Sequence, residues 1–569
     1  MKIIFLLIVF VSFVFLQKET PTAKKKNNKD KIIFNNDESS DKYLELYDRS
    51  FELLNRNYVD SINESEIIKS GIKGLMKPLD PYTKLLEGNS KESYDVLRKG
   101  KYGGVGIQIG LRRDTLTVLA PMEDSPAYSE GINCGDQILM IDSLSTEGMS
   151  VKEAANVIKG EINSIVKLVI LRPSSKEKLT FELKRDNISV KHVPYWGIDE
   201  DGVGYVRITR FSKNCAKDFK NALKDLKSDS SIDLKGLVID LRGNSGGLLS
   251  NAIKILDYLT VRGEKLLTSK GKTNRSNKEW VSRTKPIIDI DVPIAVLINK
   301  SSASASEIVA GALQDLDRAV VIGQKSFGKG LVQHMYDLND TITLKITTAK
   351  YYLPSGRLIQ KEDYLDNGFL TDGLNDKDSL FISKSGRKLK GGGGISPDIK
   401  TSINKIPPYI DAIWKEGAFL SFASYYVPFH KDIKDPIHIS NRIISEFKIF
   451  LQEYELNYTL PGEKNYLKLK KDLKNSPISI NKYSKNISYG SKNSTEIENI
   501  GSYYKQLKSI QFSLSENQRW IKNGLLREFS RVLIGEKERI KASLIEDNDY
   551  KRAKEVLLNI KEYYKILEI

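Results

Sequence analysis

The stretch that decides the fold covers residues 301–333 and reads SSASASEIVAGALQDLDRAVVIGQKSFGKGLVQ. It lies inside an alternation of strand-like and helix-like segments from Gly202 to Ala349, which is typical of an α/β core. Ser304 stands before the apolar helical pattern, and Lys329 follows 25 positions later between two glycines. A serine attacks a peptide carbonyl at neutral pH only if a base takes its proton. The four histidines stand in no recognisable motif, so lysine is the base that this sequence offers.

Both members of this pair also have a plain structural interpretation. Ser302, Ser304 and Ser306 compete as nucleophile, and the pattern from Ser304 to Glu307 matches a capping box that would only start a helix. A helix N-terminus also stabilises a developing oxyanion. Lys329 fits a surface hairpin turn, and it fits a base only if burial lowers its pKa from about 10.4. On these residues alone both interpretations stay open.

Composition limits the classes of protein. A chain of 569 residues predicts three or four domains. The net charge of +16 comes from Lys and Arg spread along the whole chain, without a basic stretch interleaved with aromatics, which argues against a nucleic-acid partner. Cys134 and Cys215 fall in different candidate domains, so no disulfide scaffold is indicated.

The first residues predict export. Lys2 precedes an apolar run from Ile3 to Leu16, which is short for a membrane span and suits a signal-peptide core. No small-x-small cleavage site is obvious, so residues 1–17 are expected to be a signal peptide or an anchor. A polar, basic linker follows over residues 18–40. Any membrane association is expected only through this N-terminal segment.

Helical patterns are expected at both ends of the remaining chain. From Tyr43 to Leu86 apolar residues recur at spacings of three and four, until Pro81 breaks the helix in LDPYTKLLE, which gives an N-terminal helical region over residues 41–96. The region 401–569 is rich in Lys and Asn and has helical spacing in its last third, from Trp520 to Leu533. No internal repeat is found.

Residues 97–185 carry a peptide-binding signature. The segment begins KYGGVGIQI, continues through SPAYSEGINCGDQILMIDS and VKEAANVIKG, and closes on VKLVILR. Closely spaced glycines let a loop expose its N–H groups to a peptide carboxylate, and the strand after them could pair with an extended peptide. The segment resembles a PDZ domain; the alternative is a small β-barrel whose glycines only form turns. The expected peptide-binding residues are Gly103, Gly104, Val105, Gly106 and Ile107.

A second glycine-rich loop follows a strand. Residues 236–250 read GLVIDLRGNSGGLLS, with a strand over Leu237–Leu241 and a helix expected over Ala252–Leu259. A nucleotide-binding interpretation fits poorly, because the loop has neither GxxxxGK[ST] nor GxGxxG. The loop could instead offer a backbone N–H to an oxyanion.

Taken together, these segments resemble the C-terminal processing peptidases, also called tail-specific proteases. The resemblance covers about residues 42–400, in the order of that family. It rests on LDPYT, the PDZ-like segment, VIDLRGNSGGLL, SASASEIVAGALQD, FGKGLVQ, YYLPSGRLIQ and GGGGISPDI. It implies a multidomain α+β chain in which a crotonase- or Clp-protease-like α/β catalytic core, residues 186–400, carries an inserted PDZ-like domain between helical N- and C-terminal regions.

The resemblance also assigns roles to residues. It implies that Ser304 is the nucleophile, that Lys329 is the general base and that Gln333 orients the lysine. Asp315 matches a supporting carboxylate. The oxyanion donors would be the N–H of Ala305 and that of Gly246 or Gly247. One departure is Ser301, which stands where the family usually has glycine and is expected to be tolerated in a turn.

The expected function is therefore that of a serine endopeptidase. It would cut exported proteins at or near their C-termini, in the bacterial periplasm or at the periplasmic face of the inner membrane, without metal or cofactor. Its partners would be proteins or peptides with free C-termini, with an adaptor or a second copy of the chain as further options. Two alternatives remain: an inactive PDZ peptide-binding scaffold, and an acyl-CoA enzyme on the related fold, for which the PDZ-like segment has no purpose.

Overall fold

The computed structural model describes residues 38–228, 232–361, 380–402, 405–475 and 492–569. The chain divides into two compact units, residues 1–74 and 75–569. The first unit contains helix α1 (Glu38–Asn57) and most of α2 (Glu64–Met76), and Asn55 Nδ2 donates a hydrogen bond to Glu64 Oε1 at 2.6 Å. The predicted signal peptide or anchor, and nearly all of the linker, lie outside the described residues. None of the helices in the described ranges combines the length and the hydropathy needed to span a bilayer.

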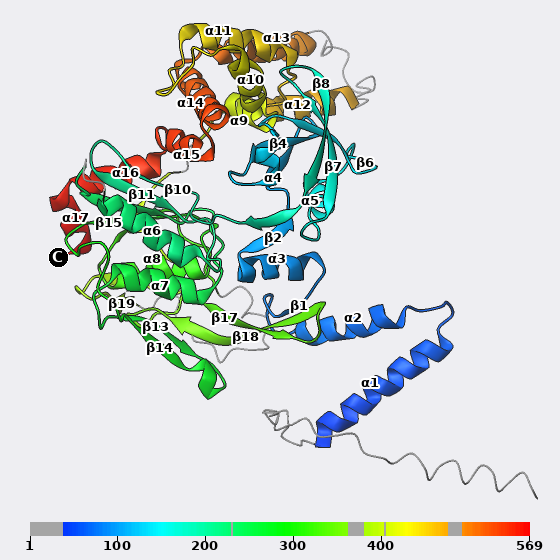
Figure 1. Cartoon of the computed structure of the whole chain (residues 1–569), viewed down its shortest axis with the longest axis vertical. Helices are drawn as coiled ribbons and strands as arrows, with labels where there is room; N and C mark the ends of the chain where they lie inside the picture. Colours follow the sequence, from blue (N-terminus) through cyan, green and yellow to red (C-terminus); the bar gives the residue numbers. More distant parts are fainter. Residues whose placement is uncertain (1–37, 229–231, 362–379, 403–404, 476–491) are drawn as a thin grey trace, which may run out of the picture. The chain divides into compact units, whose positions relative to one another are not determined.

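A six-stranded sheet forms the centre of the α/β part of the second unit (Figure 1). Its core strands, such as GLVID and IAVLI, are buried along their whole length, as expected for parallel strands covered on both faces. All neighbours are parallel except the first pair. The strand order is β10 (Tyr195–Ile198), β11 (Val203–Arg207), β12 (Gly236–Asp240), β15 (Ile294–Ile298), β16 (Val320–Gly323) and β21 (Ile399–Lys400).

Helices cover both faces of this sheet. One face is covered by α6 (Cys215–Ser228), α7 (Leu249–Leu259) and α8 (Ala305–Asp315), whose apolar side chains share one core with the strands (Figure 1). The other face is covered by the end of the chain, α15 (Glu536–Leu544), α16 (Asn548–Leu558) and α17 (Ile560–Leu567). Tyr563 Oη accepts a hydrogen bond from Ile294 N and donates one to Arg318 O, both at 3.1 Å. The last helices of the chain are therefore part of the α/β core.

A second sheet lies beside this core and shows one sequence prediction to be wrong. Its strands are β1 (Lys84–Glu87), β18 (Ile342–Tyr352), β13 (Lys265–Lys270) and β14 (Lys278–Val281), and β17 (Leu331–Asp337) also pairs with β18. Residues 84–86 were expected to continue a helical pattern. They form a strand because Asp80 accepts hydrogen bonds from Tyr82 N and Thr83 N, which makes a turn, and β1 then pairs with β18. Helix α3 (Asn89–Lys99) follows.

The PDZ-like segment forms its own six-stranded sheet around an apolar core. The predicted strands and helix are present with nearly the expected bounds. The elements are β3 (Ile107–Arg112), β4 (Thr115–Pro121), α4 (Pro126–Ser129), β5 (Gln137–Ile141), β6 (Leu144–Ser145), α5 (Val151–Ile158), β7 (Ile165–Arg172) and β8 (Glu177–Lys184). Strands β2 (Lys101–Gly104) and β9 (Asp186–Ser189) pair with each other where the segment leaves and rejoins the core.

Most of the remaining C-terminal region is a helical domain with an aromatic core. The predicted helix around Trp520 is present as α14 (Ser515–Leu533), in which Trp520, Leu525 and Phe529 are buried. The other helices are α9 (Pro408–Lys415), α10 (Ala418–Tyr426), α11 (Asn441–Phe450), α12 (Glu463–Asn475) and α13 (Lys492–Ser509). A short hairpin of β19 (Leu380–Ile382) and β20 (Lys388–Lys390) lies outside the main sheets.

Candidate active site

One cavity of about 410 Å³ brings the predicted catalytic and oxyanion residues together. It lies where the glycine loop after β12, the start of α8 and strands β1, β17 and β18 meet. The predicted residues that line it are Ser304, Ala305, Lys329, Gln333, Gly246 and Gly247.

The three competing serines have different surroundings. Ser302 is fully buried and its Oγ donates to Leu241 O at 2.9 Å, and Ser306 is fully buried and its Oγ donates to Asn244 O at 2.8 Å. Both hydroxyls therefore tie the serine turn to the glycine loop. Ser304 is half-buried, lines the cavity and has φ +54° and ψ −113°, a backbone conformation that is uncommon for a residue other than glycine.

Glycine is required in the loop that faces Ser304. A Cβ on Gly246 would lie 2.9 Å from Cβ of Ser304 and 3.0 Å from Ala305 N, so any side chain would fill the space above the serine. The N–H of Gly246 already donates to Asn244 Oδ1 at 2.9 Å. Of the two predicted glycine donors, Gly247 is therefore the better placed to donate to a ligand. Ala305 is the first residue of α8, where a backbone N–H has no partner within the helix.

Glu307 connects the serine turn to the lysine loop. Its carboxylate is fully buried and accepts four hydrogen bonds. The donors are Ser304 N at 2.7 Å, Lys329 N at 2.9 Å, Gly328 N at 2.6 Å and Ser326 Oγ at 2.5 Å. Burial raises the pKa of Glu307, and these four donors oppose that shift by favouring the charged form. In the expected capping box, the Glu307 side chain accepts a hydrogen bond from Ser304 N, and this bond is present. The same carboxylate also accepts a hydrogen bond from Lys329 N and so holds the lysine segment in place.

Tyr351 makes a second connection between the same two segments. Its ring is buried in β18, and its hydroxyl lies within hydrogen-bonding distance of Ser304 O, at 3.3 Å, and of Lys329 O. Burial raises the pKa of Tyr351 well above its usual value, so the hydroxyl stays protonated and can donate. Ser304 and Lys329 are thus held through their N–H groups by Glu307 and through their carbonyls by Tyr351.

The environment of Lys329 favours its neutral form. Its Nζ lies 4.7 Å from the centre of the Tyr82 ring, within the LDPYT segment. The pKa of Lys329 is lowered to about 8, mainly by burial and also by the charges of Lys345 and Lys84, while Glu307 and Asp80 act in the opposite direction. At pH 7 to 8 a substantial fraction of this lysine is therefore free to accept a proton.

Gln333 lies in the cavity, and its side-chain amide donates to Thr347. Its Nε2 donates to Thr347 Oγ1 at 3.5 Å, and Thr347 Oγ1 donates to Asp80 Oδ1 at 3.2 Å. The chain of contacts from Gln333 thus reaches the turn that carries Tyr82, which covers Lys329. A role of Gln333 in orienting Lys329 remains a prediction.

Asp315 lies at the far end of α8, outside the cavity lining. It is buried, forms a 2.7 Å ion pair with Arg357 and accepts a hydrogen bond from Ser355 N at 2.9 Å. It therefore fastens the end of α8 to the segment after β18, as suits a supporting carboxylate.

The five predicted peptide-binding residues are divided between two strands and the turn between them. Gly103 and Gly104 belong to β2, Ile107 opens β3, and Val105 and Gly106 connect the strands. Val105 O accepts a hydrogen bond from Ala127 N at 3.0 Å. Strand β3 is at the edge of its sheet, so its outer side is open for pairing with an added strand.

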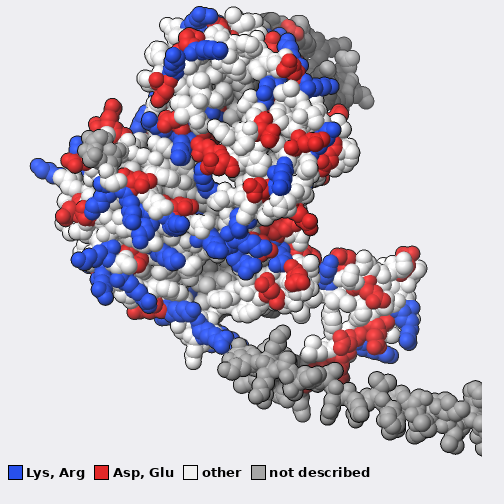
Figure 2. Space-filling model, in the orientation of Figure 1, with Lys and Arg blue, Asp and Glu red and all other residues white. Residues whose placement is uncertain are grey.

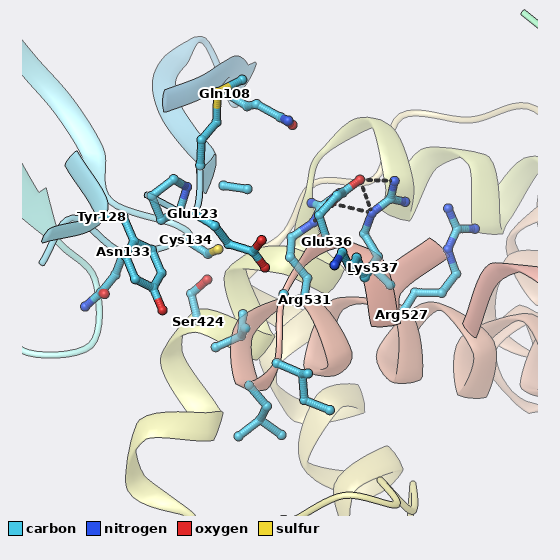
Figure 3. A pocket seen from close by; sticks show the side chains of 18 of the residues that line it. Gln108, Glu123, Tyr128, Asn133, Cys134, Ser424, Arg527, Arg531, Glu536 and Lys537 are labelled. Atoms are coloured by element: carbon cyan, nitrogen blue, oxygen red, sulfur yellow. Dashed lines mark hydrogen bonds and ion pairs between the residues drawn. The ribbon is translucent and has the colours of Figure 1, made fainter. Parts of the chain in front are cut away.

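A larger cavity of about 1310 Å³ lies away from Ser304, between the PDZ-like segment, the start of the core and the C-terminal helices (Figure 3). Figure 3 shows Cys134 and Tyr128 on one side and Arg531 on the other. Burial raises the pKa of the Cys134 thiol to about 12, so this cysteine is a poor nucleophile. Arg531 is paired with Glu536 at 3.2 Å. The smaller cavity, whose lining contains Ser304 and a lysine of lowered pKa, is therefore the candidate active site.

Comparisons with known proteins show the family of this chain. Peptidase family S41 matches residues 202–368, a PDZ domain matches residues 117–172, and a probable PDZ-protease C-terminal helical domain matches residues 409–557. A carboxy-terminal-processing protease of Bartonella bacilliformis is 36% identical over 354 residues, 62% of this chain and 80% of the relative. A carboxyl-terminal-processing protease of a Synechocystis species is 35% identical over 316 residues, 54% of this chain and 72% of the relative. A solved structure titled photosystem II D1 C-terminal processing protease is 25% identical, with a TM-score of 0.34, and covers 64% of this chain and 94% of its own.

The site and the similarity together define a serine-type peptidase. The chain belongs to the carboxy-terminal processing proteases of peptidase family S41. The predicted architecture is confirmed: mixed helix and sheet, a PDZ domain, the S41 peptidase core and a helical C-terminal domain.

Proposed function

We propose that this protein is an endopeptidase that works with a Ser304–Lys329 dyad and cleaves exported proteins at or near their C-termini. The observation that carries the dyad is the double connection between the two residues, through Glu307 and Tyr351, at a cavity where Lys329 has a pKa of about 8. A serine and a partly neutral lysine on the lining of one cavity supply the nucleophile and the base that acyl transfer needs.

The first half of the reaction forms an acyl-enzyme. Neutral Lys329 Nζ takes the Ser304 hydroxyl proton while Oγ bonds to the peptide carbonyl carbon. The carbonyl oxygen becomes an oxyanion that accepts hydrogen bonds from the N–H groups of Ala305 and Gly247. Protonated Lys329 then gives its proton to the amine as the C–N bond breaks.

The second half releases the acyl group. Lys329, neutral again, takes a proton from water as the water oxygen bonds to the acyl carbon. When the bond to Oγ breaks, the lysine returns the proton to Ser304, and the product leaves as a carboxylic acid, which loses its proton to solvent water. Gln333 acts by keeping the turn around Lys329 in place through Thr347 and Asp80.

The PDZ domain would hold the C-terminus of the substrate. The turn from Gly104 to Ile107 supplies backbone N–H groups to the carboxylate, and the open edge of β3 pairs with the peptide that precedes it. A C-terminal amide in place of the acid removes the charge that this turn would bind, so weaker binding of the amidated peptide to the intact protein is the expected result. Equal affinity for both peptides would contradict the proposal.

Export rests on the apolar run from Ile3 to Leu16 after Lys2. Residues 1–40 fused to a reporter that is active only outside the cytoplasm would give a signal if they direct export. Retention of an inactive reporter in the cytoplasm would contradict this part of the proposal.

Cleavage of an unfolded protein substrate tests the dyad. Ser304→Ala and Lys329→Ala should each lower the rate by at least about a thousandfold and leave the circular dichroism spectrum unchanged. Ser301→Gly, which places glycine three residues before the nucleophile, is the matched control and should retain activity. Activity in either dyad variant would contradict the proposal, and an inactive wild-type enzyme would favour a peptide-binding scaffold.

A further inference from the structure

The cavity around Ser304 has an unusual charge. Its lining contains four basic side chains and, among the described residues that line it, neither Asp nor Glu. Both basic and acidic side chains are spread over the face of the molecule shown in Figure 2. The basic residues of the lining are Lys84, Lys329, Lys345 and Arg210.

Two of these lysines are directly opposite each other. Lys84 on β1 pairs with Lys345 on β18 in the antiparallel ladder. Because side chains alternate along a strand, Lys84 and Leu86 face the cavity while Leu85 is buried on the other side. Like charges at directly opposite positions destabilise a sheet. The stability of the fold therefore gives no reason for this pair.

The carboxylates nearby are committed to other partners. Asp80 accepts hydrogen bonds from the backbone of Tyr82 and Thr83 and from the Thr347 hydroxyl, and Glu307 accepts its four from the serine and lysine segments. Neither Lys84 nor Lys345 forms an ion pair within the described ranges of the chain. The two ammonium groups thus face the cavity without an ion pair to a carboxylate in the described part of the chain, and only the nearby charge of Asp80 acts to raise the pKa of Lys345.

We infer that Lys84 and Lys345 bind a carboxylate of the substrate, so that the enzyme favours a peptide bond close to an acidic side chain or to the free C-terminus. This rests on the proposed function of the cavity. A carboxylate between two ammonium groups relieves their repulsion and gains charge-assisted hydrogen bonds. The substrate class is therefore a peptide with a carboxylate near the bond that is cut, in addition to any carboxylate held by the PDZ domain.

Matched peptides test the inference with the full-length enzyme. One cleaved sequence is prepared with Glu or Gln at each position within three residues of the cut, and each version carries either a C-terminal acid or a C-terminal amide. For the wild type, at least one carboxylate should raise kcat/KM about five- to tenfold over its neutral counterpart, the size of a partly exposed ion pair. The position that carries the effect distinguishes a side-chain carboxylate from the C-terminal one.

The variant Lys84→Gln/Lys345→Gln should reduce this preference to about one. Because the preference is a ratio taken within each variant, any change in the reactivity of Lys329 cancels. The control is Lys270→Gln/Lys278→Gln, which removes the same charge from the same sheet outside the cavity and should keep the wild-type preference. Since substitution removes a repulsion, the melting temperature of the test variant should equal or exceed that of the wild type.

Three results would overturn the inference. These are equal kcat/KM of the wild type for all peptides, a preference that survives in the test variant, and a clear loss of stability in that variant, which would show a structural role. Failure of the wild type to cleave any of the peptides would contradict the proposed function itself, and this inference with it.

Discussion

The backbone N–H groups of Ser304 and Lys329 both donate to Oε2 of Glu307, at 2.7 and 2.9 Å. One buried carboxylate thus sets the separation of the proposed nucleophile and base, although 24 residues lie between them in the sequence. Gly328 N and Ser326 Oγ donate to the other oxygen, so all the described contacts of this group come from neutral donors.

Glu307→Gln should lower kcat by about a hundredfold with little change in KM. An amide offers one acceptor oxygen where four donors converge, so the serine and lysine segments would move apart, and a misplacement of about 1 Å costs a rate of this order. Steady-state kinetics give kcat and KM of each variant separately and so show which of the two changes. Glu279→Gln, on the exposed part of β14, is the control with the same charge change. A wild-type kcat for the Glu307 variant would show that the connection does not matter.

The rate should depend on the protonation of Lys329. The base is active only when neutral, so kcat/KM should rise with pH through a midpoint near 8 and then level off. Lys345 and Lys84 lower this pKa, while Glu307 and Asp80 raise it. Lys345→Gln removes one of the positive charges, so its midpoint should move upward and its rate at pH 7 should fall. A pH-independent rate, or a midpoint unmoved in that variant, would contradict this assignment.

Gly246→Ala should abolish activity, whereas Gly243→Ala should retain most of it. Both glycines have positive φ, +97° and +75°, so both substitutions strain the backbone. Only the Cβ at position 246 would lie 2.9 Å from Cβ of Ser304, and a Cβ at position 243 meets no atom within 4 Å. Comparing the two rates separates occlusion of the site from loop strain. Similar losses in both variants would mean that strain alone explains the effect.

Val556→Asp should destabilise the peptidase core, although it lies at the far end of the sequence. Val556 on α16 is fully buried against the catalytic sheet, and an unpaired carboxylate there costs several kcal/mol (about 3 or more). Soluble yield and the first transition in thermal unfolding report the loss. Glu555→Asp, exposed on the same helix, should behave as the wild type. A soluble, fully active Val556 variant would show that the C-terminal helices are dispensable.

The sequence was most informative where a local motif carries the chemistry. The turn around Ser304, the loop around Lys329 and the glycines near Gly246 were all recognised from short patterns, and the structure places them on one cavity. Glu307 was interpreted only as part of a helix cap, because its bonds to Lys329 join segments that are distant in the sequence. Its four hydrogen bonds from neutral donors became visible only in three dimensions.

Other features depend on long-range pairing and could not be read from periodicity. Tyr351 looks like an ordinary strand residue until its hydroxyl is seen between two carbonyls. Residues 84–86 were assigned to the end of a helical pattern, because Leu85 and Leu86 fit the spacing of a helix as well as that of a strand. Their pairing with β18 is what makes them a strand. The packing of α16 on the catalytic sheet was not predicted, because that sheet lies some 300 residues earlier in the sequence.

Covalent labelling of Ser304 by a fluorophosphonate, followed by mass spectrometry of the labelled peptide, tests the central claim most directly. We predict a single adduct on Ser304 in the wild type, a labelling rate that rises through pH 8, and labelling at least about a hundredfold slower in Lys329→Ala. An adduct on Ser302 or Ser306, or an unchanged labelling rate in Lys329→Ala, would contradict the Ser304–Lys329 dyad.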